Sequence, residues 1–440
     1  MSTSTDRHRD EGFFQFRNIA ILAGIMRILF VHQNFPGQYV HLAPALAQAG
    51  HEVRALMLEP TARPLPGVTC TRYRVTRSST PQIHPWVAEY ETKVLRGEGC
   101  ARAALALREQ HGFMPDLICV HPGWGEALFL RDIWPEARQL HFVEWFYGWE
   151  GHDVTFDPEF PPRGIEARLR LRAKNTHLLQ SLVEMDAGVS PTAWQRSTVP
   201  PAFQHKIRTL HDGVDTDLIR PDPEAVFEHG PLRLRHGDEV LSFINRNFEP
   251  NRGYHVFMRA LPALLRERPQ AQVVMVGGSG VSYGARPQDG RSWQDTLRDE
   301  IAPQLDQAMR ARVHFVGRLP HPQLMKLYQV TRAHVYLTYP FVLSWSMLEA
   351  MSAGALVIGS RTAPVEEVIE HGRNGLLVDF FDREGLVRTM ADALAAPPGT
   401  HDAIRSTARE TVVRRYDLRR VCLPGQVALV EEIGRGPRVA

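Results

Sequence analysis

Short hydrophobic runs bounded by glycine and polar residues recur along the chain and predict buried strands. The first runs cover Arg27–Val31, a segment that opens after Gly50, and Pro115–Val120. A helix is expected from about Tyr39 to Gln48, between the first two runs. Because two parallel strands need a long crossover connection, this strand–helix–strand order predicts a parallel sheet.

The second half of the chain repeats this alternation after a polar, proline-containing stretch at residues 221–238. Strands are expected at 239–245, 271–277, 312–317, 334–338 and 355–358, and helices at 254–266, 322–329 and about 344–354. A chain of 440 residues exceeds what one hydrophobic core usually supports. We therefore expect domains at 26–212 and 213–405, followed by C-terminal helices at 406–440 that cross back to the first domain.

The first 25 residues have a different pattern. Residues 1–10 are polar and charged, and residues 19–25 form a short apolar run. The acidic Asp10 and Glu11 make this a poor signal peptide, and the run is too short to span a bilayer. We interpret residues 1–25 as a disordered or wrongly assigned extension, with a targeting role as the alternative. Translation could begin at Met1 or at Met26.

Composition narrows the class of protein. Hydrophobic residues make up 43% of the chain and charged residues 23%, as in ordinary globular proteins. The 51 basic residues nearly balance the 49 acidic ones, so no bulk field favours nucleic acid. The four cysteines lie far apart without metal or redox spacing, which fits a reducing cytoplasm. No later stretch is long enough for a membrane helix.

A long helix is expected from Arg163 to Leu182, and its first part, Arg163–Lys174, is basic. A run of this kind is usually a solvated face. The alternative interpretation is docking to a charged acceptor or to an anionic membrane surface, at the inner face of the membrane.

The stretch 334–358 carries the first candidate chemistry. A strand ends at Tyr339-Pro340, a helix opens near Ser344, and Gly354 suits a C-terminal cap. The first amides of a helix lack helical partners, so the turn at Ser344, Trp345 and Ser346 predicts an anion site. Glu349 lies about one turn inside, where its carboxylate can reach a hydroxyl of the same ligand.

Two cations flank the first strand-to-helix turn of the second half. Arg246 follows the strand directly, and Arg252 precedes Gly253 and the next helix. Guanidinium groups offer forked donors to phosphate oxygens, so the pair suits a diphosphate. Ordinary surface arginines are the alternative.

Three segments then occur in a recognisable order: Leu348-Glu-Ala-Met-Ser-Ala-Gly354, Pro364-Val-Glu-Glu-Val-Ile369 and Asn374-Gly-Leu-Leu-Val378. They resemble the donor-binding segment of glycosyltransferase family 4, and the resemblance extends over roughly 26–430. It implies an α/β GT-B fold, in which two Rossmann-like domains with parallel sheets face a central cleft. It also implies retaining transfer from a nucleoside-diphosphate sugar of the UDP or GDP type.

The resemblance assigns roles to these residues. Glu349 would hold the ribose, and Arg246 with Arg252 would replace the usual arginine and lysine at the diphosphate. The family usually has a glutamate for the donor-sugar hydroxyls where this chain has Phe341. The nucleotide end of the site thus matches the family, and the identity of the donor sugar stays open.

Further donor contacts are expected at the ends of other strands. Gly37 lies where the first strand turns into its helix, the place where ligands bind in open α/β sheets. The position of His121 matches the family histidine that faces the donor sugar. Gly278 and Leu319 follow two strands of the second half and are also expected at the donor.

The sequence gives weaker signals for acceptor-binding residues and for a metal site. Glu144, Tyr147 and Asp153 form a polar-aromatic set that could hold a sugar or simply pack a loop. Asp215-Thr-Asp217 has the form of a metal-binding motif but lies in a segment that resembles the family linker. Since GT-B enzymes generally need no catalytic metal, we expect neither a metal nor a cofactor.

The sequence therefore predicts a hexosyl-type glycosyltransferase that glycosylates a hydroxyl acceptor in polysaccharide, glycolipid or metabolite biosynthesis. One alternative is a non-catalytic nucleotide-sugar binding subunit, motivated by Phe341. Another is a GT-B-fold epimerase or phosphorylase. The donor sugar, base, acceptor and oligomeric state stay open.

Overall fold

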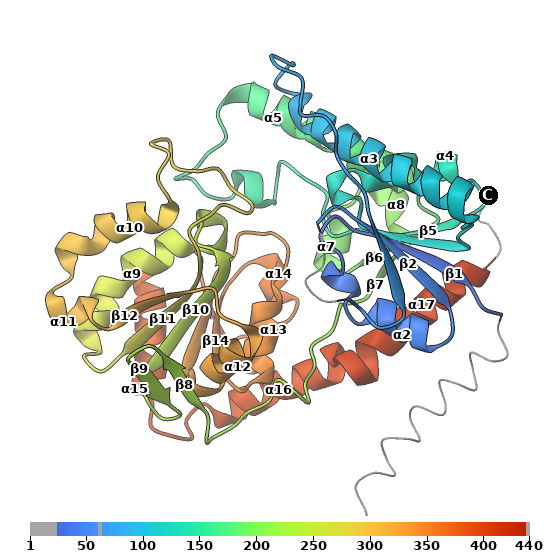
Figure 1. Cartoon of the computed structure of the whole chain (residues 1–440). Helices are drawn as coiled ribbons and strands as arrows, with labels where there is room; N and C mark the ends of the chain where they lie inside the picture. Colours follow the sequence, from blue (N-terminus) through green and yellow to red (C-terminus); the bar gives the residue numbers. More distant parts are fainter. Residues whose placement is uncertain (1–23, 60–63, 437–440) are drawn as a thin grey trace, which may run out of the picture. The chain divides into compact units, whose positions relative to one another are not determined.

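The structure is a computed structural model that describes residues 24–59 and 64–436. The interpretation of residues 1–25 concerns positions that lie almost wholly outside this range. The chain forms two compact units (Figure 1). Unit 1 contains the residues up to Tyr147, Arg163–Asp212 and the residues from Leu423 onward. Unit 2 contains Gly148–Pro162 and Gly213–Cys422. The segment 148–162, expected in the first domain, thus packs with unit 2.

Unit 1 is built on a seven-stranded parallel sheet in the order β3-β2-β1-β4-β5-β6-β7. Apart from Arg27 at the start of β1, its central strands β1 and β4 are buried, which explains their continuous apolar runs. The strands are β1 (Arg27–Val31), β2 (Glu52–Met57), β3 (Val68–Arg72), β4 (Leu117–Val120), β5 (Arg138–Phe142), β6 (Ala187–Ser190) and β7 (Ile207–Thr209).

Two hydrophobic clusters cover the two faces of this sheet. One contains residues of α2 and α17, and the other contains residues of α3 and α4. The helices of unit 1 are α2 (Leu42–Gln48), α3 (Ala88–His111), α4 (Leu130–Ile133), α5 (Gly164–Lys174), α6 (Thr176–Glu184), α7 (Ala193–Ser197), α8 (Pro201–Gln204) and α17 (Leu423–Arg435).

The long helix expected from Arg163 onward is two helices that meet at Asn175. The side-chain amide of Asn175 donates to the carbonyl of Tyr147 at 2.7 Å and accepts from its amide at 3.1 Å. This reciprocal pair fixes the junction. α5 contains no buried residue, as expected for a solvated helix.

Unit 2 is built on a six-stranded parallel sheet in the order β12-β11-β10-β13-β14-β15. The polar stretch before it contains an unexpected antiparallel hairpin, whose Phe227 and Leu234 enter the core. The strands are β8 (Val226–His229), β9 (Leu232–Arg235), β10 (Val240–Asn247), β11 (Gln272–Gly278), β12 (Val313–Gly317), β13 (Ala333–Tyr336), β14 (Leu356–Ser360) and β15 (Leu376–Val378).

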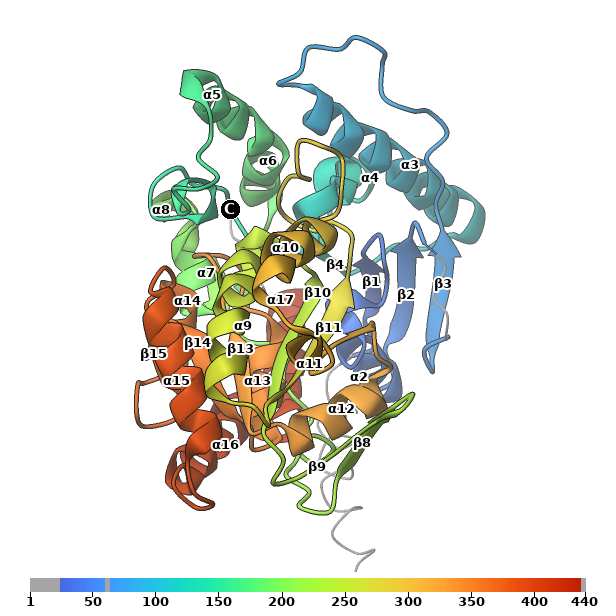
Figure 2. The ribbon, with the colours of Figure 1, turned by 90° about the vertical axis from the view of Figure 1, so that its left-hand side faces the viewer.

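Helices cover both faces of this sheet, and a separate cluster fills each side. α9, α10 and α15 cover the face in front in Figure 2, and α12, α13 and α16 cover the other. The helices are α9 (Tyr254–Glu267), α10 (Trp293–Ile301), α11 (Gln307–Arg310), α12 (His321–Val330), α13 (Trp345–Ser352), α14 (Ala363–Glu366), α15 (Arg383–Ala395) and α16 (Asp402–Tyr416). Two α/β units with parallel sheets confirm the predicted fold class.

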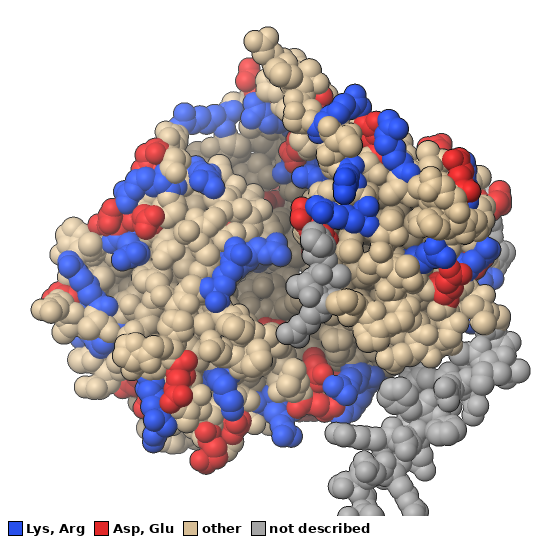
Figure 3. Space-filling view, viewed as in Figure 1, with Lys and Arg blue, Asp and Glu red and all other residues tan. Residues whose placement is uncertain are grey.

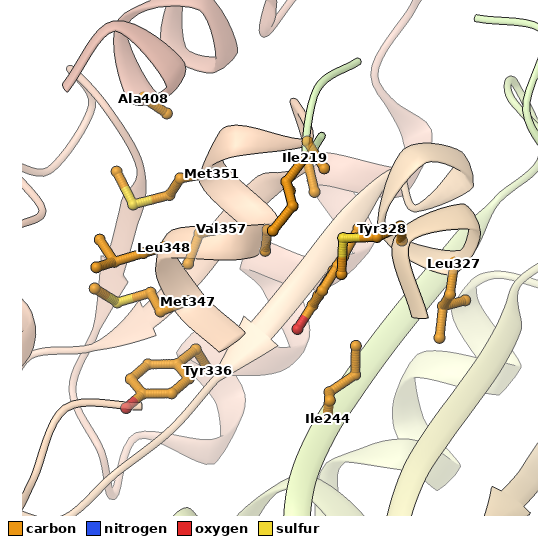
Figure 4. Packing of buried hydrophobic residues seen from close by; sticks show 14 of the residues in the cluster. Ile219, Ile244, Leu327, Tyr328, Tyr336, Met347, Leu348, Met351, Val357 and Ala408 are labelled. Carbon is orange, nitrogen blue, oxygen red and sulfur yellow. The ribbon is translucent and has the colours of Figure 1, made fainter. Parts of the chain in front are cut away.

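Helix α13 is anchored by its apolar side chains. Met347, Leu348 and Met351 are fully buried and lie close to Tyr336 and Val357 (Figure 4). Their burial fixes the helix against the sheet. The side chain of Glu349 therefore has a defined position, and it is 14% exposed.

The surface agrees with the balanced composition. Basic and acidic side chains are interspersed over the face shown in Figure 3. Within the described ranges, every helix is too short or too polar to cross a membrane. All four cysteines are free thiols.

Candidate functional site

The candidate donor site lies at the carboxyl ends of β10 and β13. These strands are neighbours, and the strand order reverses between them, since β11 and β12 lie on one side of β10 and β14 and β15 lie beyond β13. Ligands of open α/β sheets bind in the crevice at such a switch point. The turn carrying Arg252 follows β10, and the segment leading to Ser344 and α13 follows β13.

Arg252 is buried at this point, only 4% exposed. Its Nη1 donates to the hydroxyl of Thr338 at 2.8 Å and to the carbonyl of Val342 at 2.9 Å, and lies 3.3 Å from the Tyr336 hydroxyl. Burial opposes its charge, but the neighbouring phenols favour it, and the net effect raises the pKa of Arg252. Arg252 therefore holds residues 338–342 in place, and one of its guanidinium nitrogens is already hydrogen-bonded to the protein.

Arg246 has a different environment. Its side chain is exposed near the end of β10, and within the described residues it has no protein partner. Of the two predicted phosphate ligands, Arg246 is the one whose whole guanidinium group is available to an anion.

The amides at the start of α13 differ from the expectation. The amide of Ser344 donates to the Tyr336 hydroxyl at 2.8 Å, and the amide of Ser346 donates to the Ser344 hydroxyl at 3.4 Å. Ser344 is the N-cap of the helix. Both amides thus have protein acceptors. A phosphate would have to displace the Tyr336 and Ser344 hydroxyls to accept hydrogen bonds from these amides. The 3.4 Å bond is long and easily exchanged. Trp345 is 44% exposed beside them.

Glu349 is paired with a histidine that sequence reasoning missed. The Nε2 of His321 lies 3.2 Å from Oε1 of Glu349. This hydrogen bond raises the pKa of His321, and the imidazole is half exposed. The only signal in the sequence is the position of His321 at the start of α12, two residues after the expected donor contact at Leu319. Leu319 itself is partly buried against the core.

Phe341 stands in a small aromatic group. Its ring is 5% exposed and lies 4.9 Å from the ring of Tyr283. The guanidinium carbon of Arg252 lies 5.5 Å from the Phe341 ring and 5.1 Å from the Tyr283 ring. Aromatic faces attract a cation at these distances. The residue that replaces the usual acid therefore packs near Arg252 and Tyr283.

Tyr283 is positioned by a second missed residue, Glu249. This buried carboxylate accepts hydrogen bonds from the amides of Ser282, Tyr283 and Gly284, at 3.1, 3.0 and 3.0 Å. Successive amides of this kind form an anion-binding concavity. Here the protein's own carboxylate occupies it and ties the loop after β11 to the Arg252 turn.

Gly278 permits a close approach in the same region. A Cβ at this position would lie 2.6 Å from Oδ1 of Asn247, and Arg318 donates to that oxygen at 3.2 Å. A side chain at 278 would displace both groups. This supports a packing requirement for glycine, and its donor contact stays a prediction.

In unit 1, His121 lies at the exit of β4. Its Nδ1 accepts from the amide of Gly123 at 3.1 Å, so the proton of the neutral ring is on Nε2. Nε2 lies 3.5 Å from Oε2 of Glu144. The ring stacks on Trp124 at 4.2 Å and on Phe142 at 5.5 Å. This arrangement presents a fixed N–H donor in an aromatic setting.

His32 at the exit of β1 is a third missed residue. Its ring centroid lies 5.5 Å from that of His121, and its Nδ1 accepts from the amide of Asn34. Burial, together with the nearby His121, lowers the pKa of His32 to about 3. Gly37 has a φ of +47°, and a Cβ there would lie 2.5 Å from Nε2 of His32. Glycine therefore lets the turn cover this neutral imidazole.

The predicted acceptor set is divided between the units. Glu144 and Tyr147 belong to unit 1, and Asp153 belongs to unit 2. The ring of Tyr147 lies 3.9 Å from the ammonium of Lys174. Its backbone bonds to Asn175. A structural role for Tyr147 is therefore established, and an acceptor role for these three residues stays a prediction.

The candidate metal motif forms ion pairs instead. Asp215 lies 2.8 Å from Arg419, and Asp217 lies 3.0 Å from Arg420. In the part of the chain that the structure describes, no cluster of three His, Cys, Asp or Glu side chains is arranged to hold a metal ion.

Comparison with known families places this fold. A family model described as "Glycosyl transferase family 4 group" matches residues 49–219. A second, described as "Glycosyl transferases group 1", matches residues 227–411. The two α/β units with parallel sheets agree with the GT-B class, and the chain belongs to the family 4 and group 1 glycosyltransferases. The predicted family is confirmed.

Curated relatives are distant. D-inositol 3-phosphate glycosyltransferase of Mycolicibacterium vanbaalenii is 27% identical over 55% of this chain and 51% of its own length. A GDP-mannose-dependent alpha-(1-6)-phosphatidylinositol monomannoside mannosyltransferase of Mycolicibacterium smegmatis is 26% identical over 62% of this chain and 67% of its own length. The chain thus spans about half to two thirds of the length of these relatives.

Solved structures share the fold over nearly the whole chain. Sucrose-phosphate synthase from Thermosynechococcus elongatus superposes with a TM-score of 0.69 at 20% identity, covering 92% of this chain and 98% of that chain. Anabaena HepE in complex with UDP-glucose superposes with a TM-score of 0.59 at 16% identity, covering 92% and 98%. At these identities the likeness concerns the fold alone.

Proposed function

We propose that the protein is a retaining glycosyltransferase that binds a UDP- or GDP-sugar on unit 2 and transfers the sugar to a hydroxyl acceptor. The relatives include a GDP-mannose-dependent enzyme, and a structure with the same fold contains UDP-glucose. These names support a nucleoside-diphosphate sugar as the donor, and they do not decide between a uracil and a guanine base. Glycan or glycolipid synthesis is the setting most consistent with them.

The proposal depends on one observation. Arg246 offers an exposed guanidinium without a protein partner, within the described chain, at the switch point of the unit 2 sheet. During glycosyl transfer, negative charge builds up on the leaving diphosphate. A donor held against this charge in a water-excluded site typically lowers the barrier by ~3 kcal/mol. Arg246 would supply that donor.

Other side chains bind the rest of the donor. Glu349 would accept hydrogen bonds from the ribose hydroxyls in place of its bond to His321. Arg252 would keep the Phe341–Ser344 segment in register and offer its remaining N–H groups. We propose a front-face reaction in which the donor phosphate oxygen takes the acceptor proton. Neither a metal nor another cofactor takes part. The role expected for His121 at the donor sugar stays a prediction.

The test is a donor panel. The full chain is mixed with labelled UDP- and GDP-sugars, and nucleotide release is followed with and without candidate acceptors. One donor should be hydrolysed or transferred, and NMR of the product should show the donor's anomeric configuration. Inversion would exclude the retaining mechanism. Failure to bind any nucleoside diphosphate would exclude the donor site itself.

A non-catalytic nucleotide-sugar binding subunit is the second candidate. The observation that favours it is Phe341, an apolar ring buried against Tyr283 where the family usually has an acid. Tight donor binding by calorimetry, without turnover over a broad acceptor panel, would support this candidate over the transferase.

A further inference from the structure

Residues 148–162 form a segment that we call the strap. In sequence it lies between two parts of unit 1, since it follows Tyr147 and precedes Arg163. In structure it packs with unit 2. The chain therefore leaves unit 1 after β5, contributes fifteen residues (148–162) to the donor-binding unit, and then returns to form α5.

The centre of the strap is a buried carboxylate. Oδ2 of Asp157 accepts from the Tyr339 hydroxyl at 2.5 Å and lies 3.0 Å from Nε2 of His255. Its Oδ1 accepts from the amide of Glu159 at 2.9 Å. A buried charge is costly unless such donors surround it. Although burial acts against ionisation, these hydrogen bonds lower the pKa of Asp157.

Two phenylalanines of the strap fill apolar sites on either side. The Phe156 ring lies 5.1 Å from the rings of Tyr339, Phe380 and Phe381. Phe160 lies 5.3 Å from His255 and 5.1 Å from Trp293. Outside them, the carboxylate of Glu159 forms two hydrogen bonds with Arg259, at 2.6 and 2.8 Å. The strap is therefore docked by aromatic contacts and an ion pair as well as by Asp157.

Tyr339, the hydrogen-bond partner of Asp157, is the first residue of the segment 339–346, which carries the predicted donor contacts. Tyr339 follows β13 and immediately precedes Pro340 and Phe341. Its amide donates to the carbonyl of Asn251 at 3.0 Å, next to Arg252. Tyr339 is thus held at its backbone by the Arg252 turn and at its hydroxyl by the strap. Its hydroxyl bond to Asp157 fixes the direction in which residues 339–346 leave the sheet.

We propose that Asp157 is a positioning residue for donor binding, which acts through the Tyr339 hydroxyl to hold residues 339–346. The inference rests on the proposed function, because those residues carry the predicted donor contacts. It also gives the strap a role that its place in the sequence, within the first domain, does not suggest. Removing either partner should loosen the segment and weaken donor binding.

The test uses Asp157→Asn and Tyr339→Phe, singly and together, in the full chain. Both changes preserve size, and Tyr339→Phe keeps the ring contacts with Phe156 and Phe380. Each single change should raise the Kd for the nucleoside diphosphate about tenfold, and the double change should do little more, since the two groups act as one unit. Donor KM should rise by a similar factor, while acceptor KM stays constant.

Glu159→Gln is the matched control. It weakens the ion pair of the same strap with Arg259 but leaves the Asp157–Tyr339 bond intact. It should change thermal stability slightly and nucleotide affinity not at all. Equal loss of affinity in all three single variants, or additive losses in the double variant, would overturn the positioning role.

Hydrogen exchange separates this inference from the proposed function. Amides of residues 339–346 should exchange faster in Asp157→Asn and Tyr339→Phe than in Glu159→Gln, whether or not a nucleotide binds. If wild-type protein binds no nucleoside diphosphate, the proposed function fails, and the exchange pattern still decides whether Asp157 holds the segment. Unchanged exchange in both variants would refute the inference.

Discussion

The two units place different chemistry at the same point of a similar sheet. In unit 1, the exits of neighbouring strands β1 and β4 carry His32 and His121. In unit 2, the neighbouring strands β10 and β13 are followed by the Arg252 turn and the Phe341 segment. The first group is aromatic, and its His32 is neutral because burial lowers the pKa of this side chain to about 3. The second is cationic. A common frame thus offers one surface suited to sugar hydroxyls and another suited to phosphate.

In each unit, the turn after the first of these strands, β1 or β10, also depends on one glycine. Gly37 and Gly253 have φ values of +47° and +67° and precede the first helix of their unit. A Cβ at Gly37 would collide with His32, and a Cβ at Gly253 would collide with Leu337. Both turns therefore require glycine, and the side chains around them set the charge. The four predictions below test this contrast, from the largest expected effect to the smallest.

Arg252→Ala should have the largest effect, because the arginine is part of the fold as well as a proposed donor ligand. It would leave the Thr338 hydroxyl and the Val342 carbonyl without their donor and open a cavity beside Tyr283. We expect a loss of about 3 kcal/mol in the free energy of unfolding, with weaker nucleotide binding. Urea denaturation measures the first and calorimetry the second. Unchanged stability would mean that unit 2 does not depend on this cation.

Arg246→Ala should separate binding from folding. The side chain is exposed, so the melting temperature should stay within about 1 °C of wild type. The Kd for the nucleoside diphosphate should rise about tenfold, equivalent to ~1.4 kcal/mol. Arg246→Lys keeps the charge, so its Kd in calorimetry should lie between the values for wild type and Arg246→Ala. A Kd equal to that of wild type would remove Arg246 from the donor site.

His32→Gln tests the neutral side of the contrast. The native pKa of His32 is about 3 against an ordinary value of 6.5, so the unfolded chain binds more protons between these values. The stability contribution is complete above pH 6.5 and is lost as the pH falls toward 3. His32→Gln should therefore flatten the decline in unfolding free energy between pH 6.5 and 5.5 by about 1 kcal/mol. An unaltered pH slope would show that His32 is not buried as a neutral ring.

Phe341→Glu should have the smallest effect on nucleotide affinity. A carboxylate there would lie near Arg252 and face the sugar end of the donor, so sugar preference should change several-fold. Competition between UDP-sugars or GDP-sugars that differ in one hydroxyl measures the preference, with Phe341→Leu as the apolar control. A larger change in affinity for the free nucleoside diphosphate than in sugar preference would show that the segment is misassigned.

The strands and fold class could be predicted because buried parallel strands read as continuous apolar runs, as in β1, β4 and β10. The β8–β9 hairpin escaped prediction because only Phe227 and Leu234 of it are buried, so its pattern is mostly polar. β3 escaped for a related reason, since its residues are half-buried or exposed.

For the candidate site, the sequence indicated the residue types, and the contacts had to come from the structure. The pairing of Glu349 with His321 joins the successive helices α13 and α12, and the two residues are 28 positions apart. The capture of three loop amides by Glu249 depends on how the loop after β11 folds back. No periodicity encodes either contact. The amides at Ser344 and Ser346 also needed the structure, because their acceptors are hydroxyl groups placed by the fold.

The exchange of segments between the units has a consequence for synthesis and engineering. Leu429 and Val430 of α17 complete the unit 1 core together with Ile28 and Phe30, so that core stays incomplete on the ribosome until α17 has been synthesised. No single cut yields either unit intact: a fragment starting at Gly213 lacks Phe156, Asp157 and Phe160 and carries α17 without its docking surface. A fragment that contains all of unit 2 would have to join residues 148–162, as a fused peptide, to a chain that starts at Gly213 and ends near Cys422.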